Sequence, residues 1–228
     1  MAGSGSAGTF VEQLDAETAA ALERLGVPRQ YRRGATVMLE GDRNDDVLLI
    51  TEGRLKVVKS SDDGREQVLA VRGPGALVGE LTAVANDGLP RSATVVAIEP
   101  VRARVLTGDA FRSFLVAHPG SSIALLRLLV GRLRASDRKR AEFGSLDVSH
   151  RVARLLLDLA TDGGAAGDDG PVTIGISLSQ EELAGMVATS RETMVRALAA
   201  LRRRGLIETG RRSITILDVT RLRDYAIE

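Results

Sequence analysis

Short runs of β-forming residues, many of them bounded by glycine, fill the chain between Tyr31 and Thr107. They recur roughly every ten residues, a spacing typical of a small antiparallel barrel. Asp63-Gly64 lies between two alternating runs and indicates a hairpin. We therefore predict an all-β centre with strands at residues 35–39, 47–51, 54–60, 67–71, 92–97 and 101–106, flanked by amphipathic helices at 11–25 and at 109–117, the second of which stops near Pro119.

A heptad pattern follows this region, over residues 121–143. Its positions alternate at spacings of three and four residues: Leu126, Leu129, Leu133, Ser136, Arg140 and Phe143. A stripe this narrow is buried more easily against a copy of itself than over a globular core, so we expect a parallel homodimer along this helix. The alternative is that the helix packs on its own barrel. Ser136 or Asp137 places a polar group near the seam, which costs stability unless a partner such as a ligand satisfies it.

The last third of the chain has the pattern of a helix-turn-helix followed by a wing. Residues 179–182 form a capping box that opens a short helix, and a tight turn at 188–190 separates it from a second helix at 191–204. The remaining predicted elements are a helix at 148–160, a loop at 163–170, a strand at 172–176 and a two-stranded wing at 206–208 and 213–217.

Arginines gather on the second helix of this pair. The whole chain has a formal net charge of +1, but residues 191–212 hold seven Arg and only two acidic residues. Arg191, Glu192 and Arg196 share one helical face, where Arg can pair with guanine and Glu with the cytosine amine. Thr193 can reach a phosphate or a thymine methyl group. We expect phosphate contacts from Arg202, Arg203, Arg204, Arg211 and Arg212; the alternative is a helical hairpin with a solvated basic face.

The segments 180–184 (Gln-Glu-Glu-Leu-Ala) and 190–193 (Ser-Arg-Glu-Thr), with Arg196, resemble the helix-turn-helix of the CRP/FNR family of bacterial transcription regulators. The resemblance implies an α+β fold: an N-terminal antiparallel β-barrel (jelly roll), a long dimerisation helix and a C-terminal winged helix-turn-helix. It implies a palindrome of TGTGA-like half-sites, contacted by Ser179, Gln180, Arg191, Glu192, Thr193 and Arg196. The implied parts are a flexible leader (1–8), a cyclic-nucleotide-binding β-barrel (9–120), the dimerisation helix (121–144), a hinge (145–147) and the DNA-binding domain (148–228).

Residues 78–81 (Val-Gly-Glu-Leu) and 90–94 (Pro-Arg-Ser-Ala-Thr) resemble the phosphate-binding cassette of cyclic-nucleotide-binding domains. The glycine lets backbone N–H groups approach a phosphate, Arg91 supplies a two-pronged cation and Ser92 adds a hydroxyl. Glu80 is expected to accept the proton of a ribose 2′-hydroxyl. An ordinary surface loop with a Glu–Arg ion pair is the alternative.

The purine end of this pocket departs from the cyclic-AMP-binding pattern of the family. Two small polar residues of the dimer helix contact the adenine amine there, and the matching positions in this chain are Ser136 and Asp137. A carboxylate repels the lone pair of adenine N1 but can accept both donors of guanine, so cyclic GMP or cyclic di-GMP stays open beside cyclic AMP, the default. The R-x-x-D pattern of cyclic di-GMP binders occurs three times in the chain, so by itself it does not indicate which nucleotide binds. The alternative for Asp137 is a solvated residue paired with a nearby arginine. The expected ligand-binding set is Gly79, Glu80, Leu81, Arg91, Ser92, Arg132, Ser136 and Asp137.

Composition excludes several other classes of protein. The chain has no cysteine, and only His118 and His150 are histidines, so iron–sulfur clusters are excluded and we expect no metal and no haem. No nucleophile, base and orienting group form a visible set, so we expect no enzyme. No apolar run approaches the ~20 residues of a membrane span, and no signal peptide begins the chain, so we expect a cytoplasmic protein without a membrane partner.

These features together predict a homodimeric, ligand-responsive transcription regulator. Its expected partners are double-stranded DNA, a second copy of the chain and RNA polymerase. One alternative is a constitutive DNA binder whose pocket is vestigial or takes an unrelated metabolite. The other is an architectural DNA binder of the nucleoid type.

Overall fold

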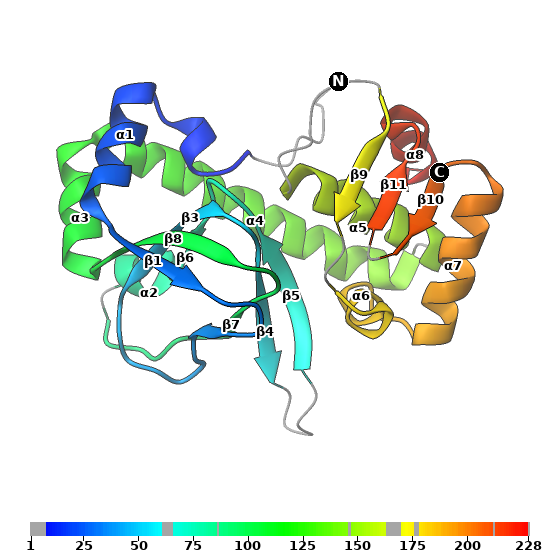
Figure 1. Ribbon diagram of the computed structural model, residues 1–228, viewed down its shortest axis with the longest axis horizontal. Coiled ribbons are helices and arrows are strands. Elements are labelled where there is room, and N and C mark those ends of the chain that lie inside the picture. Colours follow the sequence, from blue (N-terminus) through cyan, green and yellow to red (C-terminus); the bar gives the residue numbers. More distant parts are fainter. Residues whose placement is uncertain are drawn as a thin grey trace. The chain divides into compact units, whose positions relative to one another are not determined.

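The computed structural model describes residues 8–60, 66–85, 87–145, 147–162, 170–175, 178–211 and 213–227. By its internal contacts the chain divides into two compact units, residues 1–133 and 134–228 (Figure 1). Several predicted features lie outside the described residues: most of the leader, the Asp63-Gly64 turn, Leu146 of the hinge, residues 163–169 of the predicted loop, the end of the strand at 172–176 and Arg212.

The N-terminal unit consists of short strands and the helices that flank them. Its elements are η1 (Val11–Gln13), α1 (Ala16–Leu25), β1 (Val27–Tyr31), β2 (Thr36–Met38), β3 (Val47–Glu52), β4 (Leu55–Ser60), β5 (Glu66–Arg72), β6 (Leu77–Val78), α2 (Glu80–Ala85), β7 (Thr94–Ala97), β8 (Val101–Leu106), α3 (Gly108–Ala117) and the first part of α4 (Pro119–Ser145). The strands form two four-stranded sheets, in the orders β1-β8-β3-β6 and β2-β7-β4-β5, with antiparallel pairing throughout. The predicted antiparallel architecture is confirmed, and β1, β6 and α2 are elements that the sequence pattern did not reveal.

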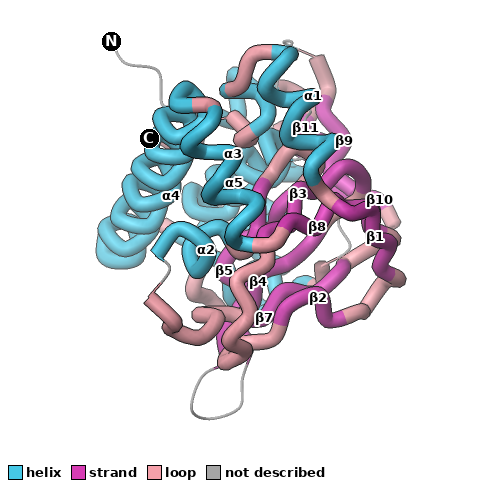
Figure 2. Tube along the Cα trace, turned by 90° about the vertical axis from the view of Figure 1, so that its left-hand side faces the viewer, coloured by secondary structure: helices cyan, strands magenta, loops and turns pink. Residues whose placement is uncertain are grey.

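Strand β3 is buried on both of its faces. Leu48 and Ile50 pack with residues of both sheets in one apolar cluster, whereas Val47 and Leu49 belong to a second cluster that includes α3 and α4. Because side chains alternate across a strand, one short run thus serves two cores. Figure 2 shows α1, α2 and α3 on the same side of β3 and β8, where this second cluster lies.

The predicted helix at 11–25 is wrong as a single helix, whereas the predicted stop near Pro119 is confirmed. The single helix expected at 11–25 is interrupted at Leu14, whose backbone is extended, and Asp15 then caps α1 by accepting a hydrogen bond from the Thr18 N–H at 2.8 Å. The helix predicted at 109–117 is confirmed as α3 (Gly108–Ala117), which stops before Pro119, and Pro119 is the first residue of α4, two residues earlier than the predicted start at 121. Proline is favourable there because its missing N–H has no intrahelical partner in the first turn and its φ suits a helix.

Helix α4 carries two apolar faces in its first half. One face is buried in the N-terminal unit and consists of Ser121, Ala124, Leu125 and Leu128. The other is exposed and consists of Ile123, Leu126, Val130 and Leu133, which are 50%, 59%, 38% and 60% accessible. The predicted heptad seam is divided between them, because Leu126 and Leu133 are exposed while Leu129 packs against the buried cluster.

No single helix among the described residues is long and apolar enough to cross a membrane. Helix α3 and residues 119–138 of α4 meet the length and composition criterion only when taken together, and they are bent by 113°.

The C-terminal unit contains the predicted helix-turn-helix. Its elements after α4 are α5 (Val148–Asp162), β9 (Val172–Gly175), α6 (Gln180–Met186), α7 (Arg191–Arg203), β10 (Ile207–Gly210), β11 (Ser213–Ile216) and α8 (Val219–Tyr225). Helix α5 packs against α7 and α8, and α6 packs against α7. The predicted pairing of the two wing strands is confirmed by β10 and β11, but the sheet has a third strand, because β9 pairs with β11 and places Ile174 opposite Ile214, both buried. Helix α8 was not predicted.

Candidate functional sites

A tight turn at Gly79 joins β6 to α2. Gly79 has a φ of +87°. A Cβ atom built on it would lie 2.6 Å from the Asp46 carbonyl oxygen and 2.7 Å from Arg91 Nη1. Only glycine suits both this backbone conformation and this close approach, so the turn brings its backbone directly against the Arg91 side chain.

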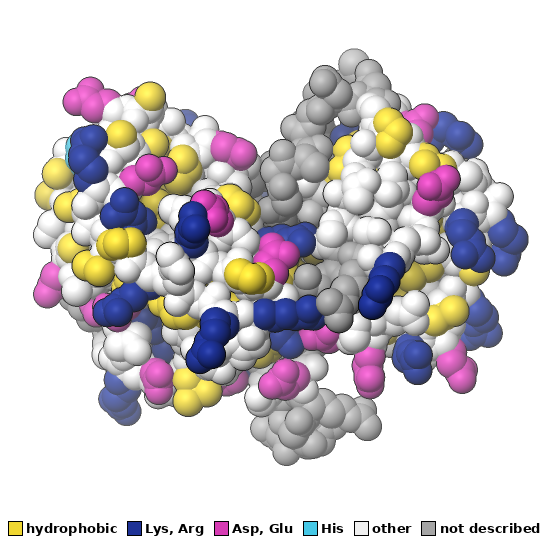
Figure 3. Space-filling view, in the orientation of Figure 1, with side chains coloured by type: hydrophobic (Ala, Val, Ile, Leu, Met, Phe, Trp, Pro, Cys, Tyr) yellow, Lys and Arg dark blue, Asp and Glu magenta, His cyan; other side chains and the backbone are white. Residues whose placement is uncertain are grey.

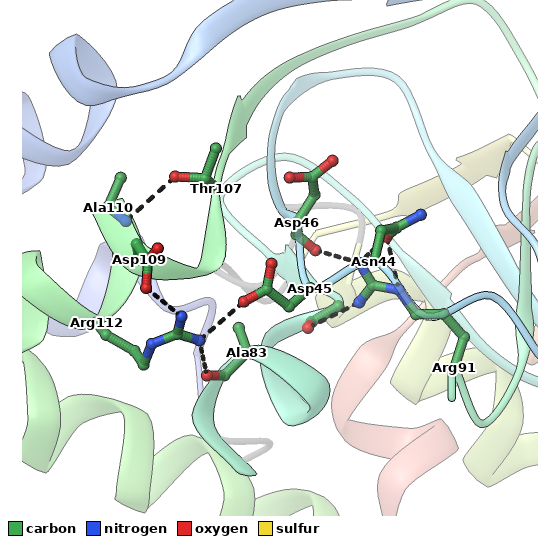
Figure 4. Close-up of polar contacts among 10 residues, drawn as sticks. Asn44, Asp45, Asp46, Ala83, Arg91, Thr107, Asp109, Ala110 and Arg112 are labelled. Carbon is green, nitrogen blue, oxygen red and sulfur yellow. Dashed lines mark hydrogen bonds and ion pairs between the residues drawn. The ribbon is translucent and has the colours of Figure 1, made fainter. Parts of the chain in front are cut away.

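Arg91 is the one buried cation among the described residues of the N-terminal unit, with an exposed fraction of 4%. Its guanidinium donates to Asn44 Oδ1 from Nε at 3.2 Å and from Nη2 at 2.6 Å. It also donates to the Asp46 carbonyl oxygen from Nη2 at 2.6 Å and to the Gly79 carbonyl oxygen from Nη1 at 3.0 Å (Figure 4). Burial lowers the pKa of Arg91, and nearby carboxylates, that of Asp46 above all, act in the opposite direction. The arginine stays charged because its ordinary pKa lies far above neutral pH.

Glu80, the first residue of α2, is 3% exposed and has a cationic partner on another helix. Arg132 of α4 pairs with it through Nη1 and Oε1, and donates from Nη2 to the Leu77 carbonyl oxygen at 3.1 Å. An unpaired carboxylate at such a depth is strongly destabilising, so this ion pair is what permits Glu80 to lie inside. The structure therefore joins two residues of the expected ligand-binding set that are 52 positions apart.

Arg112 of α3 anchors the loop that supplies Asn44, and sequence analysis did not single it out. Its Nη1 donates to Asp45 Oδ2 at 2.9 Å and to the Ala83 carbonyl oxygen at 2.7 Å, and its Nη2 donates to Asp109 Oδ1 at 2.5 Å (Figure 4). The hydrogen bond that Arg112 donates to Asp109, followed by the one that it donates to Asp45, raises the pKa of Arg112. Because Asp45 and Arg112 are 67 positions apart, no local sequence signal marks the contact.

The remaining expected ligand-binding residues take no part in these contacts. Leu81 is exposed on α2, and Ser92 is exposed directly after Arg91. Ser136 is half-buried and Asp137 exposed on α4, four and five residues after Arg132. Asp137 Oδ1 lies 3.4 Å from Arg140 Nη1, so the pairing with a neighbouring arginine that was weighed as its alternative role is present.

The helix-turn-helix is held by caps at the start of both helices. The Ser179 hydroxyl accepts from the Glu182 N–H, and the Glu182 carboxylate accepts from the Ser179 N–H, which confirms the predicted capping box. Gln180, the first residue of α6, is exposed. Ser190 caps α7 in the same way by accepting from the Thr193 N–H at 3.2 Å. These local bonds fix where each helix begins.

The exposed face of α7 forms a shallow hollow lined by Arg191, Glu192, Val195 and Arg196. The Thr193 hydroxyl is not free beside it, because it accepts from Arg196 Nη2 at 3.0 Å and contacts Ser190 Oγ at 3.0 Å. Thr193 thereby positions Arg196. Val195, which is 43% exposed, is an apolar member of this face that sequence analysis missed, although its spacing of four from Arg191 indicates it.

Basic side chains surround this helix. Figure 3 shows Lys and Arg side chains gathered over the region of α7. Arg202 and Arg203 are exposed. Arg204 is exposed too, and its guanidinium lies over the Tyr225 ring, 4.6 Å from the ring centroid, so it also takes part in packing within the unit.

Comparison with known proteins assigns a domain family to each part of the chain. The family model of the cyclic nucleotide-binding domain matches residues 28–118, and that of the Crp-like helix-turn-helix domain matches residues 150–225. The chain is 37% identical over 216 residues, 95% of each protein, to a CRP-like cAMP-activated global transcriptional regulator of Mycobacterium tuberculosis. The chain belongs to the CRP/FNR family of transcription regulators.

Further CRP/FNR regulators resemble the chain in sequence and in structure. The cyclic AMP receptor protein of Thermus thermophilus is 29% identical over 198 residues, 87% of each protein. The solved structure of a CRP-family transcriptional regulator from the same species matches with a TM-score of 0.68 at 28% identity, over 88% of this chain and 97% of that one.

The chemistry of the N-terminal site fits the ligand class of its CRP/FNR domain. A cyclic nucleotide carries one anionic phosphodiester, a ribose 2′-hydroxyl and a base. Arg91 supplies a buried cation against a glycine turn, and Glu80 supplies a carboxylate that can accept from a hydroxyl. The residues present therefore match the phosphate and the sugar of such a ligand.

Proposed function

We propose that this CRP/FNR regulator is a homodimer whose binding to DNA is controlled by a cyclic nucleotide, with cyclic AMP as the default effector. The observation that carries the proposal is the ion pair between Glu80 of α2 and Arg132 of α4. It connects the expected sugar-binding carboxylate with the long helix that leads toward the DNA-binding unit. A ribose hydroxyl that binds Glu80 shares or replaces the contact of this carboxylate with Arg132, and in this way acts on a contact of α4.

The names of the relatives support cyclic AMP. Proteins from M. tuberculosis and T. thermophilus that are similar to this chain are named as cAMP-activated and as a cyclic AMP receptor. Asp137 remains the reason to test guanine ligands, because its carboxylate can accept from two guanine donors once Arg140 is displaced. We place Gly79, Glu80, Leu81, Arg91, Ser92 and Arg132 at the phosphate and sugar, and Ser136 and Asp137 at the base.

The exposed apolar face of α4 supports a dimer. Four large apolar side chains on one helical face, Ile123, Leu126, Val130 and Leu133, are costly to leave in water and match a parallel helix pair. Two recognition helices related by a twofold axis would read half-sites about one DNA turn apart, as in a palindrome with TGTGA-like arms. We propose the same domain limits as the sequence predicts: a ligand-binding domain at 9–120, the dimerisation helix at 121–144, a hinge at 145–147 and the DNA-binding domain at 148–228.

Base readout is assigned to α7. We propose that Arg191, Glu192 and Arg196 contact base edges, while Thr193 positions Arg196 and Val195 offers an apolar contact to a thymine methyl group. Ser179 and Gln180 at the start of α6 are assigned to the DNA backbone. RNA polymerase is the proposed protein partner, the cytoplasm the proposed location, and no catalytic activity, metal or haem is part of the proposal.

Calorimetric titration with cyclic AMP, cyclic GMP and cyclic di-GMP tests the effector, with Asp137→Ser as the matched variant. Preference for cyclic AMP that survives Asp137→Ser supports the default. Preference for a guanine ligand that Asp137→Ser abolishes makes Asp137 the base-reading residue.

DNA affinity measured with and without the preferred nucleotide tests the control. Linkage requires that DNA tighten nucleotide binding by the same factor by which nucleotide tightens DNA binding. Equal DNA affinity in both conditions would favour a constitutive binder. Protein-dependent protection of the DNA that spreads along it, and is not confined to a palindrome, would favour an architectural protein.

A further inference from the structure

Asn44 occupies one edge of the Arg91 guanidinium. The Asn44 Oδ1 atom accepts from both Nε and Nη2 of Arg91, at 3.2 and 2.6 Å. These two N–H groups point in parallel and form the pair with which an arginine binds an oxyanion in a bidentate manner. The edge suited to a phosphate is thus filled by a neutral amide oxygen of the protein itself (Figure 4).

The other acceptors of Arg91 differ from Asn44 in kind. They are the carbonyl oxygens of Asp46, directly before β3, and of Gly79, directly after β6. Backbone at the end of a paired strand cannot move aside without disturbing the sheet. Among the described residues, Asn44 is therefore the one side chain that must give up its bonds to Arg91 for a phosphate to take them.

Hydrogen bonds and an ion pair hold the backbone of the loop around Asn44 in place, whereas the exposed Asn44 side chain can rotate once its bonds to Arg91 break. The Gly41 N–H donates to the Arg91 carbonyl oxygen at 3.0 Å, and the Arg91 N–H donates to the Asp42 carbonyl oxygen at 2.7 Å. Asp45, the next residue, is paired with Arg112. Asn44 itself is exposed, so its amide can rotate into water and be hydrated there.

We propose that Asn44 is a tethered competitor of the effector, which the phosphate of the cyclic nucleotide displaces from Arg91. The inference rests on the proposed function of Arg91 as the phosphate ligand. A neutral amide suits this role because an anionic phosphate makes the stronger, charge-assisted bonds with a guanidinium and can replace it. The Asp46 and Gly79 carbonyl oxygens keep the Arg91 guanidinium in place, while Asn44 raises the concentration at which nucleotide binds.

Calorimetric titration of the whole chain with cyclic AMP tests this proposal with two variants, which are expected to change the affinity in opposite directions. Asn44→Ala removes the competitor and is expected to tighten binding by about 3- to 10-fold, the equivalent of one hydrogen bond. Asn44→Asp replaces the amide with a carboxylate that forms a full ion pair with Arg91, and is expected to weaken binding by about 10-fold or more. Arg43→Gln, at the preceding exposed residue of the same loop, is the control and should stay within about twofold.

The outcomes separate this inference from the proposed function. Binding by the wild type that is lost in Arg91→Leu, together with unchanged or weaker binding in Asn44→Ala, overturns the role of Asn44 alone. If Asn44→Ala binds nucleotide and the wild type does not, the result supports the role of Asn44 as a competitor most strongly. Absence of binding in both proteins, with all three nucleotides, refutes the proposed function and this inference with it.

Discussion

Substitution of Gly79 by alanine should destabilise the N-terminal unit through two separable effects. An L-residue at a φ of +87° costs about 1–2 kcal/mol in backbone strain. The new Cβ would also approach the Asp46 carbonyl oxygen to 2.6 Å and Arg91 Nη1 to 2.7 Å, and crowding of that kind costs about 1–3 kcal/mol more. The expected loss in the free energy of unfolding is therefore about 2–5 kcal/mol.

Gly88 offers a matched control for the contact part of this loss. It also has a positive φ, +71°, but a Cβ there meets no atom within 4 Å. Gly88→Ala should therefore lose only the backbone part, about 1–2 kcal/mol. Urea unfolding followed by far-UV circular dichroism compares both variants in the same unit, and calorimetry should show weaker cyclic AMP binding for Gly79→Ala only. Equal losses in stability for the two variants would refute the packing argument.

Three further predictions concern the DNA, the dimer and an N-cap. Arg191→Ala should lose about 1–3 kcal/mol of DNA affinity at one guanine, whereas Arg203→Ala should weaken all sequences alike and flatten the salt dependence, as measured by binding to a set of single-base variants. A uniform loss for Arg191→Ala would contradict its role in base readout. Changing Leu126 and Leu133 to Glu should give a monomer in sedimentation, while a dimer that persists would show that the exposed face of α4 is not the interface. The hydrogen bonds from Thr18 lower the pKa of the Asp15 carboxyl, so its stabilisation is complete above the unfolded pKa of about 3.9 and is lost as pH falls through the lower folded value. The difference in melting temperature between wild type and Asp15→Ala should therefore shrink in acid, and a constant difference would disagree with this account.

Sequence reasoning was most successful where the determinants are local. The capping box at Ser179 and the start of α7 after Ser190 are set by hydrogen bonds between residues three positions apart. The same holds for the arginine-rich face of α7, because residues three and four apart share one side of a helix. These features are written in the order of the residues, so a pattern alone can identify them.

Helix boundaries were less predictable where two local signals compete. The apolar periodicity at 11–25 indicated one helix, but Asp15 offers an N-cap that restarts the helix at Ala16. Pro119 follows the end of α3 and is the first residue of α4, so the predicted stop holds while the next helix begins two residues before the predicted position 121. Periodicity in α4 could not separate a dimer seam from core packing, because the helix carries an apolar face for each.

The amino-acid sequence by itself determined the family, the order of the parts and the residue types at both sites. Only the tertiary structure decided which of those residues meet: Arg91 with Asn44 and Gly79, and Glu80 with Arg132. These contacts join residues 12 to 52 positions apart, and several involve backbone carbonyl oxygens, which every residue possesses. No sequence pattern marks such an acceptor, because its availability depends on where strand pairing and core packing leave it.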